Sequence, residues 1–380
     1  MSEDSTPIPS SAEANIPLPP ADIGDSEGPR GESVPPVIDP TPFPAEHPFI
    51  FHGNTREYFR IWIVNTLLTL LSFGLYSAWA KVRKRRYLRG SIELMQHRFE
   101  YLADPRRILV GNILVALMFL AYMVVGKVYP VVRFGALVVG LVLLPWVIVR
   151  SLAFNAHNTS YRGMRFHSRQ TYGAAGLTFI GQFIFIIATL GLYYPAWVRN
   201  QKEFFISGHQ LGDAFFRFES KSGPFYSAYL VSALIVFVVA IAGGSFIAWS
   251  TFNNGGHPPT TQQLIPFFIL YGTGLFFSKQ YVYARLFNHI WNHTQLDEHR
   301  FKATLSIKDW LKLQTVNLGA IIGTGGLLYP WAVMRSTRYT LDHLHFVAAG
   351  PIDKISRLGR RDGSALGETA AEFVGLDIGL

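Results

Sequence analysis

The 380-residue chain carries a formal net charge of +9, and 49% of its residues are hydrophobic while only 16% are charged. Soluble domains carry about 25% charged residues, so this composition indicates a membrane protein rather than a soluble domain. The chain has no cysteine, which excludes disulfides, thiolate nucleophiles and cysteine-ligated metal sites.

The first 46 residues differ in composition from the rest. They are rich in proline and serine and hold nine acidic residues against a single arginine, Arg30. Such a segment cannot bury enough apolar surface to offset the entropy of ordering. Residues 1–46 are therefore predicted to be a disordered tail and a candidate binding segment for a protein partner. Residues 351–380 are assigned to a C-terminal tail.

The body of the chain contains two kinds of apolar segment. Four segments reach, with their flanks, the length that crosses about 30 Å of hydrocarbon as a helix. They lie near 108–126, 131–149, 227–250 and 264–284. Three further stretches are interrupted by Gly, Pro, Asn or Gln, which is typical of segments that enter and leave a bilayer on one side. These are 61–78, 173–197 and 313–334.

The three interrupted stretches end in similar sequences. They read GLYSAWAKVRKRRY at 74–87, GLYYPAWVRNQKEFF at 191–205 and GLLYPWAVMRSTRY at 326–339. Arg-Phe pairs that are predicted to be short strands recur between the apolar segments. Such self-similarity indicates internal repeats, in a mainly α, multi-pass helical membrane protein with short cytoplasmic β-strands and re-entrant segments. The repeats are assigned to 47–160, 161–295 and, in part, 296–350.

The distribution of basic residues predicts the orientation. Loops 126–133 and 251–263 hold few or no Lys and Arg, so the positive-inside rule places them outside and every basic segment in the cytoplasm. Both termini are then cytoplasmic. Seven simple crossings are the alternative, and they would place the basic segment 198–226 outside.

The motifs resemble a known family. Phe51-His52-Gly53, the sequence GLYSAWAKVRKRRY and His97-Arg98-Phe99-Glu100-Tyr101 are similar to the YjgN-type family of bacterial inner-membrane proteins, which is defined as a domain of unknown function. The resemblance covers roughly residues 49–350. It implies a multi-pass protein of the bacterial inner membrane, and it supplies no catalytic residue.

Aromatic and basic residues at the ends of the interrupted stretches are candidate lipid contacts. Tryptophan and tyrosine favour the headgroup region, and a Lys or Arg near an anionic leaflet contributes about 1 kcal/mol. Simple anchoring and recognition of anionic lipid headgroups are both open. The candidates are Trp79, Lys81, Arg83, Arg86, Tyr87, Trp197, Trp331, Arg335, Arg338 and Tyr339.

Each interrupted stretch also contains one side-chain amide, from Asn65, Gln182 or Asn317. Within a bilayer such amides either hydrogen-bond between segments or line a polar path, and both readings are open. Glu100 and Glu219 occupy matching positions and are predicted to form structural ion pairs with neighbouring arginines.

His289 and His293 are four residues apart and share one helix face. Because the glutamate of a His-Glu-x-x-His motif is missing, a polar cap is favoured over a metal site. No metal and no cofactor are expected. The sequence has no phosphate-binding or nucleophile motif of the common ATPases and hydrolases, so no catalytic residue is assigned.

Function is predicted only as a class. Repeated segments that are broken within the bilayer are typical of transporters and channels, which favours a channel, a facilitator or a lipid-handling protein with anionic lipids as partners. A membrane scaffold or interaction protein is the alternative, and an intramembrane enzyme is the third hypothesis. The basic segments face a membrane by position, so no nucleic-acid partner is expected.

Overall fold

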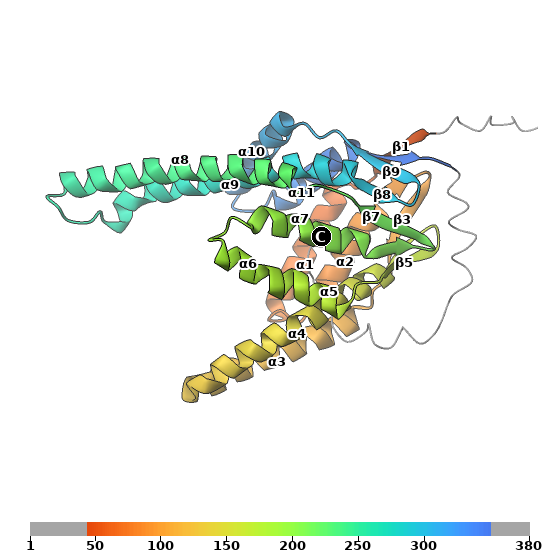
Figure 1. Ribbon diagram of the computed structural model, residues 1–380, viewed down its shortest axis with the longest axis horizontal. Coiled ribbons are helices and arrows are strands. Elements are labelled where there is room, and N and C mark those ends of the chain that lie inside the picture. The colour runs from red at the N-terminus through yellow and green to blue at the C-terminus, as the bar shows by residue number, and fades with distance from the viewer. Residues whose placement is uncertain (1–43, 351–380) are drawn as a thin grey trace, which may run out of the picture. The chain divides into compact units, whose positions relative to one another are not determined.

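The computed structural model describes residues 44–350, which belong to one unit of the chain (Figure 1). Ten short strands gather at one end of this unit, and helical hairpins run away from them. The strands are β1 (Ala45–Phe51), β2 (Ile92–Leu94), β3 (His97–Tyr101), β4 (Thr159–Tyr161), β5 (Met164–Ser168), β6 (His209–Leu211), β7 (Ala214–Phe218), β8 (Thr294–Leu296), β9 (His299–Ala303) and β10 (Leu344–Ala348).

The helices fall between the strands in a regular order. They are α1 (Thr55–Leu71), α2 (Ser77–Gly90), α3 (Pro105–Val128), α4 (Pro130–His157), α5 (Tyr172–Gly176), the π-helix η1 (Leu177–Gly181), α6 (Gln182–Ala188), α7 (Tyr194–Ser207), α8 (Gly223–Asn253), α9 (Thr261–Asn292), α10 (Ile307–Gly323) and α11 (Tyr329–Asp342).

The ten strands form a closed antiparallel barrel. Their order is β1-β10-β9-β8-β7-β6-β5-β4-β3-β2. Strand β1 closes it by pairing twice: its first half faces β10, with His47 opposite Phe346, and its second half faces β2, with Phe49 opposite Leu94. The first and last described elements of the chain are thus joined side by side.

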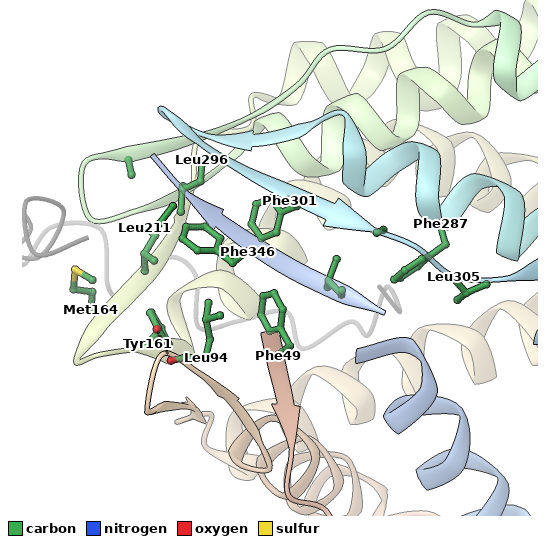
Figure 2. Close-up of a cluster of buried hydrophobic side chains, with 14 of the residues drawn as sticks. Phe49, Leu94, Tyr161, Met164, Leu211, Phe287, Leu296, Phe301, Leu305 and Phe346 are labelled. Atoms are coloured by element: carbon green, nitrogen blue, oxygen red, sulfur yellow. Dashed lines mark hydrogen bonds between the residues drawn. The ribbon is translucent and has the colours of Figure 1, made fainter. Parts of the chain in front are cut away.

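Apolar side chains fill the interior of the barrel (Figure 2). Alternate residues of β9 and β10 are buried, as the two-residue period of a strand requires, and Phe301 lies 5.3 Å from Phe346 between ring centroids. Phe49, Leu94 and Leu211 belong to the same cluster. The barrel is therefore a packed core and not an open channel.

The predicted fold class, a mainly α, multi-pass helical protein with short cytoplasmic strands and re-entrant segments, is wrong, because the strands close into a ten-stranded barrel. The Arg-Phe pairs do lie on strands, namely β3, β5, β7 and β9. What the sequence does not reveal is that these strands alternate with β2, β4, β6, β8 and β10 in one closed barrel. Strand β1 also begins at Ala45, so the last two residues assigned to the acidic tail belong to the barrel. Residues 1–43 of that tail, and the C-terminal tail, lie outside the described residues.

Five helical hairpins interrupt the barrel, and each begins and ends at a barrel strand. Two are long, α3–α4 and α8–α9. Three are short: α1–α2, α5 to α7, and α10–α11. Each helix packs against its neighbours in sequence, and α11 packs against α1. The five hairpins are therefore arranged around the barrel in the order of the sequence.

Among the described residues, three helices are long and apolar enough to cross a membrane: Pro105–Lys127, Val131–His157 and Gly223–Asn253. They correspond to three of the four crossings expected from the sequence. The fourth, at 264–284, lies in α9, which packs along α8 (Figure 1) but does not belong to this set. Lys279 and Gln280 make α9 more polar than α8.

Candidate membrane-facing site

The three interrupted stretches are helix–turn–helix hairpins with one common turn. In each, two successive residues have positive φ, and they are Phe73–Gly74, Leu190–Gly191 and Gly325–Gly326. The N–H of the glycine donates to the carbonyl oxygen five residues earlier, at 2.8, 2.7 and 2.8 Å. This is the Schellman arrangement that ends a helix on a left-handed residue, where glycine is favoured.

A hydroxyl completes each turn. Ser72, Thr189 and Thr324 accept a hydrogen bond from the backbone N–H four residues later, at 2.9, 3.0 and 3.1 Å. The hydroxyl thus satisfies one of the N–H groups that the start of a helix leaves without a partner. The chain therefore reverses direction at three equivalent places, each time with the same pair of hydrogen bonds, one donated by a glycine N–H and one accepted by a hydroxyl.

Large apolar side chains cover these turns and are exposed. Phe73 is 99% exposed and Leu190 94% exposed. Leu71, Leu192 and Ile322 are exposed by 70% or more. Isolated apolar residues on a surface are ordinary, but a concentration of them marks a surface that contacts another apolar phase.

The three predicted amides hold the two arms of their hairpins together. Asn65 donates to the carbonyl oxygen of Ala80 at 3.4 Å, and Gln182 accepts from Asn200 at 3.0 Å. Asn317 donates to Ser336 at 3.0 Å and to the Ala332 carbonyl oxygen at 3.5 Å. Each contact joins the outgoing helix to the returning helix. The choice between a packing role and a polar path stays a prediction.

The three tryptophans are partly buried at the start of the returning helices, in different contacts. Trp79 packs against the cluster around Tyr101, and the indole N–H of Trp197 donates to the Thr178 carbonyl oxygen at 2.8 Å. The guanidinium of Arg335 lies 5.1 Å from the ring centroid of Trp331. The indoles therefore also pack the hairpins, in addition to any contact with lipid.

The two tyrosines of the motif brace the helices against the barrel. The Tyr87 hydroxyl donates to the Asn54 carbonyl oxygen at 3.0 Å and accepts from the Asn54 N–H at 2.8 Å. Tyr339 packs against Trp310 and His343, with ring centroids 6.0 and 4.3 Å away.

The basic residues of α2 divide between two faces. Arg83, Lys84 and Arg86 are exposed, although Arg86 also donates to the Tyr101 carbonyl oxygen at 3.3 Å. On α11, Arg338 is exposed and donates to the Gly53 carbonyl oxygen at 3.0 Å. Lys84 belongs to the same run as the predicted residues, but the sequence motif alone did not single it out.

The other face of α2 carries Lys81, Arg85 and Arg89, four residues apart, and all three are partly buried. Arg85 donates to the Tyr101 hydroxyl at 3.0 Å and to the Asn155 side-chain oxygen at 2.6 Å, and Arg89 donates to the Thr159 hydroxyl. Burial, and then the charge of Arg85, lower the pKa values of Lys81 and Arg89. Arg85 and Arg89 thus join α2 to β3, α4 and β4.

The contacts given for the two predicted acids are with groups other than arginine. Glu100 accepts from the Ser160 hydroxyl at 3.1 Å. Arg98 instead lies 3.9 Å from Glu93, between Nε and Oε2. The backbone N–H of Glu219 donates to the His293 carbonyl oxygen, and its side chain is exposed. An ion-pair role for Glu100 and Glu219 stays a prediction.

The structure brings His289 and His293 together at the barrel end of α9, with ring centroids 4.1 Å apart. They line a cavity of about 280 Å³ with Arg285, which lies four residues before His289 on the same helix face. Among the described residues, no group of three His, Cys, Asp or Glu side chains could hold a metal ion. The spacing of Arg285, His289 and His293 is visible in the sequence, but the cavity beside them is not.

Comparison with known proteins gives matches over most of the chain. The family model described as a bacterial protein of unknown function (DUF898) matches residues 46–373. The chain is 26% identical over 275 residues to inner membrane protein YjgN of Escherichia coli K12, covering 71% of this chain but 55% of that protein. It is 23% identical over 339 residues to inner membrane protein YjgN of Salmonella typhimurium, covering 75% of this chain and 84% of that protein. No solved structure matches.

Proposed function

Because the chain belongs to the DUF898 family and is a protein of the bacterial inner membrane, we propose that it binds and holds anionic phospholipid there. The barrel lies at the cytoplasmic face, and all five hairpins enter the bilayer from it. The long hairpins cross and return, and the short ones dip in and turn back. Both termini are then cytoplasmic.

The exposed apolar turns of the three short hairpins carry this proposal. Phe73 and Leu190 have almost no contact with the rest of the chain, and in water their exposure would cost roughly 1.5–3 kcal/mol for each large side chain. Burial of these turns in hydrocarbon removes that cost. The barrel strands have only 3 to 7 residues, whereas a strand needs about 9–11 to cross a bilayer, so the helices and not the strands enter the membrane.

The positions of the cations agree with this arrangement. Arg83, Lys84 and Arg86 lie between the turn at Phe73–Gly74 and strand β2, on the arm that returns to the barrel. If the turn lies in hydrocarbon and the barrel in water, these side chains are at the level of the headgroups. Each contributes about 1 kcal/mol of attraction to an anionic leaflet.

Lipid handling has more support than solute passage. The interior of the barrel is filled by the cluster around Phe49, Phe301 and Phe346, so a solute moving along the barrel axis would have to displace packed rings. Asn65 and Asn317 hydrogen-bond within their own hairpins. The charged and apolar groups that remain exposed are those that a phospholipid would contact.

Purification of the full-length protein with its bound lipids tests the proposal. The phospholipid that stays bound in mild detergent is identified by mass spectrometry. We expect enrichment of anionic lipid over the membrane average, and loss of this enrichment in the Arg83→Gln/Lys84→Gln variant. The matched control, Arg217→Gln/Arg300→Gln, removes two exposed arginines from β7 and β9 and should keep the enrichment. Equal enrichment in all three proteins would contradict the proposal.

A further inference from the structure

A cavity of about 280 Å³ lies where the start of α8, the end of α9 and the start of α10 meet. One helix face contributes three groups that are cationic or can become so, Arg285, His289 and His293. Among residues 44–350, no acidic side chain lines the cavity. The remaining wall consists of Pro224, Leu286, Asn288, Asn292 and Ile307.

Two asparagines fix the shape of this cavity. Asn288 donates to the Leu305 carbonyl oxygen at 2.7 Å and accepts from the Leu305 N–H at 2.8 Å. Asn292 bonds Ala303 in the same way, at 3.1 and 2.7 Å. Each side-chain amide both donates to and accepts from the backbone at residue 303 or 305, at the end of β9 or just after it. These bonds hold α9 at a fixed separation from that segment.

The two histidines are also held in place. The Nε2 atom of His289 lies 2.6 Å from the Ser220 hydroxyl, and its ring meets buried Phe225 edge-on at 5.7 Å. The Nδ1 atom of His293 lies 2.8 Å from the His289 carbonyl oxygen, to which it donates. The Nε2 atom of His293 is therefore available to a ligand, and it donates a hydrogen bond when both ring nitrogens carry a proton.

The chemistry of the lining selects an anion. A guanidinium donates two parallel hydrogen bonds to phosphate oxygens, which makes arginine the preferred phosphate ligand in proteins. The acids nearest in sequence to the lining are Glu219, Asp297, Glu298 and Asp309, and none of these four lines the cavity. The volume is well above the roughly 30 Å³ of one water molecule.

We propose that this cavity binds a phosphate group, with Arg285 as its principal ligand and His293, with both ring nitrogens protonated, as a second donor. The inference rests on the proposed function in taking a phospholipid headgroup as the source of that phosphate. Pro224 lies in the first turn of α8, a helix long and apolar enough to cross the membrane, so the cavity lies at the height of the headgroups. Pro224, Leu286 and Ile307 then face the glycerol and the first acyl carbons. Free phosphate is the other source with the same chemistry.

Binding to the full-length protein in detergent tests the site. Inorganic phosphate is titrated calorimetrically, and bound phospholipid is counted by native mass spectrometry. We expect Arg285→Gln to weaken phosphate binding by at least about tenfold, as loss of a charged hydrogen bond implies, and to remove one phospholipid. His293→Gln should weaken it less. The control Arg300→Gln, at an exposed position of β9 outside the lining, should change neither. Unchanged circular dichroism and thermal unfolding show that the variants fold.

The outcomes separate this site from the general preference for anionic lipid. If the wild type binds no phosphate, or Arg285→Gln binds it as the wild type does, the site is overturned, whatever the Arg83→Gln/Lys84→Gln variant shows. If Arg285→Gln loses phosphate but keeps every phospholipid, the phosphate site stands and a lipid source is overturned. If the Arg83→Gln/Lys84→Gln variant retains the anionic enrichment of the wild type, the proposed function fails. The phosphate-binding result for the cavity is then unaffected.

Discussion

Asn317 in α10 donates a hydrogen bond of 3.0 Å to the hydroxyl of Ser336 in α11, and Asn317 is only 2% exposed. The bond joins the two arms of the third short hairpin. Asn317→Ala is expected to lower the free energy of unfolding by about 0.5–1.5 kcal/mol, because one buried hydrogen bond is lost while the Ser336 hydroxyl still accepts one from Gln314. Chemical unfolding in detergent measures this change.

A double-mutant cycle with Ser336→Ala isolates the bond. Coupling energies of buried polar pairs in membrane proteins average about 0.6 kcal/mol and reach about 1.7, and we expect a value in this range. Asn253→Ala, an exposed asparagine at the end of α8, is the matched control. If Asn317→Ala left stability unchanged, the amide would have no structural role.

The turn of the same hairpin provides a second test. Gly326 has φ of 93°, whereas Gly323 lies in α10, and both have open space where a Cβ would stand. Gly326→Ala should destabilise by about 1–2 kcal/mol, because an L-residue is strained there. Gly323→Ala should be neutral or should stabilise by up to about 1 kcal/mol. Equal effects would show that the turn conformation is not required.

Substitution of two phenylalanines, one buried and one exposed, distinguishes a side chain that stabilises the fold from one that contacts the membrane. Phe346 in the barrel is 2% exposed and Phe73 at a hairpin turn is 99% exposed. Phe346→Ala should cost about 3–5 kcal/mol of stability, measured by unfolding in detergent. Phe73→Ala should leave that stability unchanged. Because the turn should then enter the hydrocarbon less deeply, lipids brominated on their acyl chains should quench a fluorophore attached beside the turn less strongly. A stability loss from Phe73→Ala would place this side chain in a protein contact.

Acid is expected to destabilise the barrel through His299. This residue is 6% exposed, and its Nδ1 accepts a 3.1 Å hydrogen bond from the Ala349 N–H. Burial lowers the pKa of His299, and the carboxylates of Glu298 and Asp297 oppose this only in part. The unfolded chain therefore binds the proton more readily than the folded protein. Stability is fully present above the unfolded-state pKa of about 6.5 and declines as the pH falls below it.

Unfolding midpoints between about pH 8 and pH 5 measure this dependence. His299→Gln keeps a hydrogen-bond acceptor but removes the titrating imidazole. The stability of this variant should therefore fall less steeply as the pH is lowered. Part of the decline should remain, because burial also lowers the pKa of His209 in β6. His257→Gln, in the exposed loop between α8 and α9, should leave the pH dependence as it is. A wild-type midpoint that rises toward pH 5 would contradict the assignment.

The local features of this fold are visible in the sequence. Gly74, Gly191 and Gly326 end three helices by the same turn, and the amides of Asn65 and Asn317 lie fifteen residues before the carbonyl groups they bond. Such features depend on residues close in the chain, so a recurring pattern is enough to find them.

The barrel could not be predicted in this way. Strands such as β2 and β4 have three residues, which is too short to show an alternation of buried and exposed side chains. Closure depends on β1 pairing with β10, at the opposite end of the described chain, and no local signal specifies that pairing. The cavity beside His293 was missed for the same reason, because Arg285 and Ile307 come from different hairpins.

The central claim, that every hairpin returns to the face from which it left, is tested most directly by single-cysteine labelling. Since the chain has no native cysteine, each introduced thiol reports its own position. Gln96→Cys, Asp213→Cys and Glu298→Cys stand in barrel turns, and Tyr129→Cys and His257→Cys stand at the ends of the long hairpins. We predict that a membrane-impermeant maleimide applied from the periplasm labels Tyr129→Cys and His257→Cys only. Periplasmic labelling of Asp213→Cys would contradict the account.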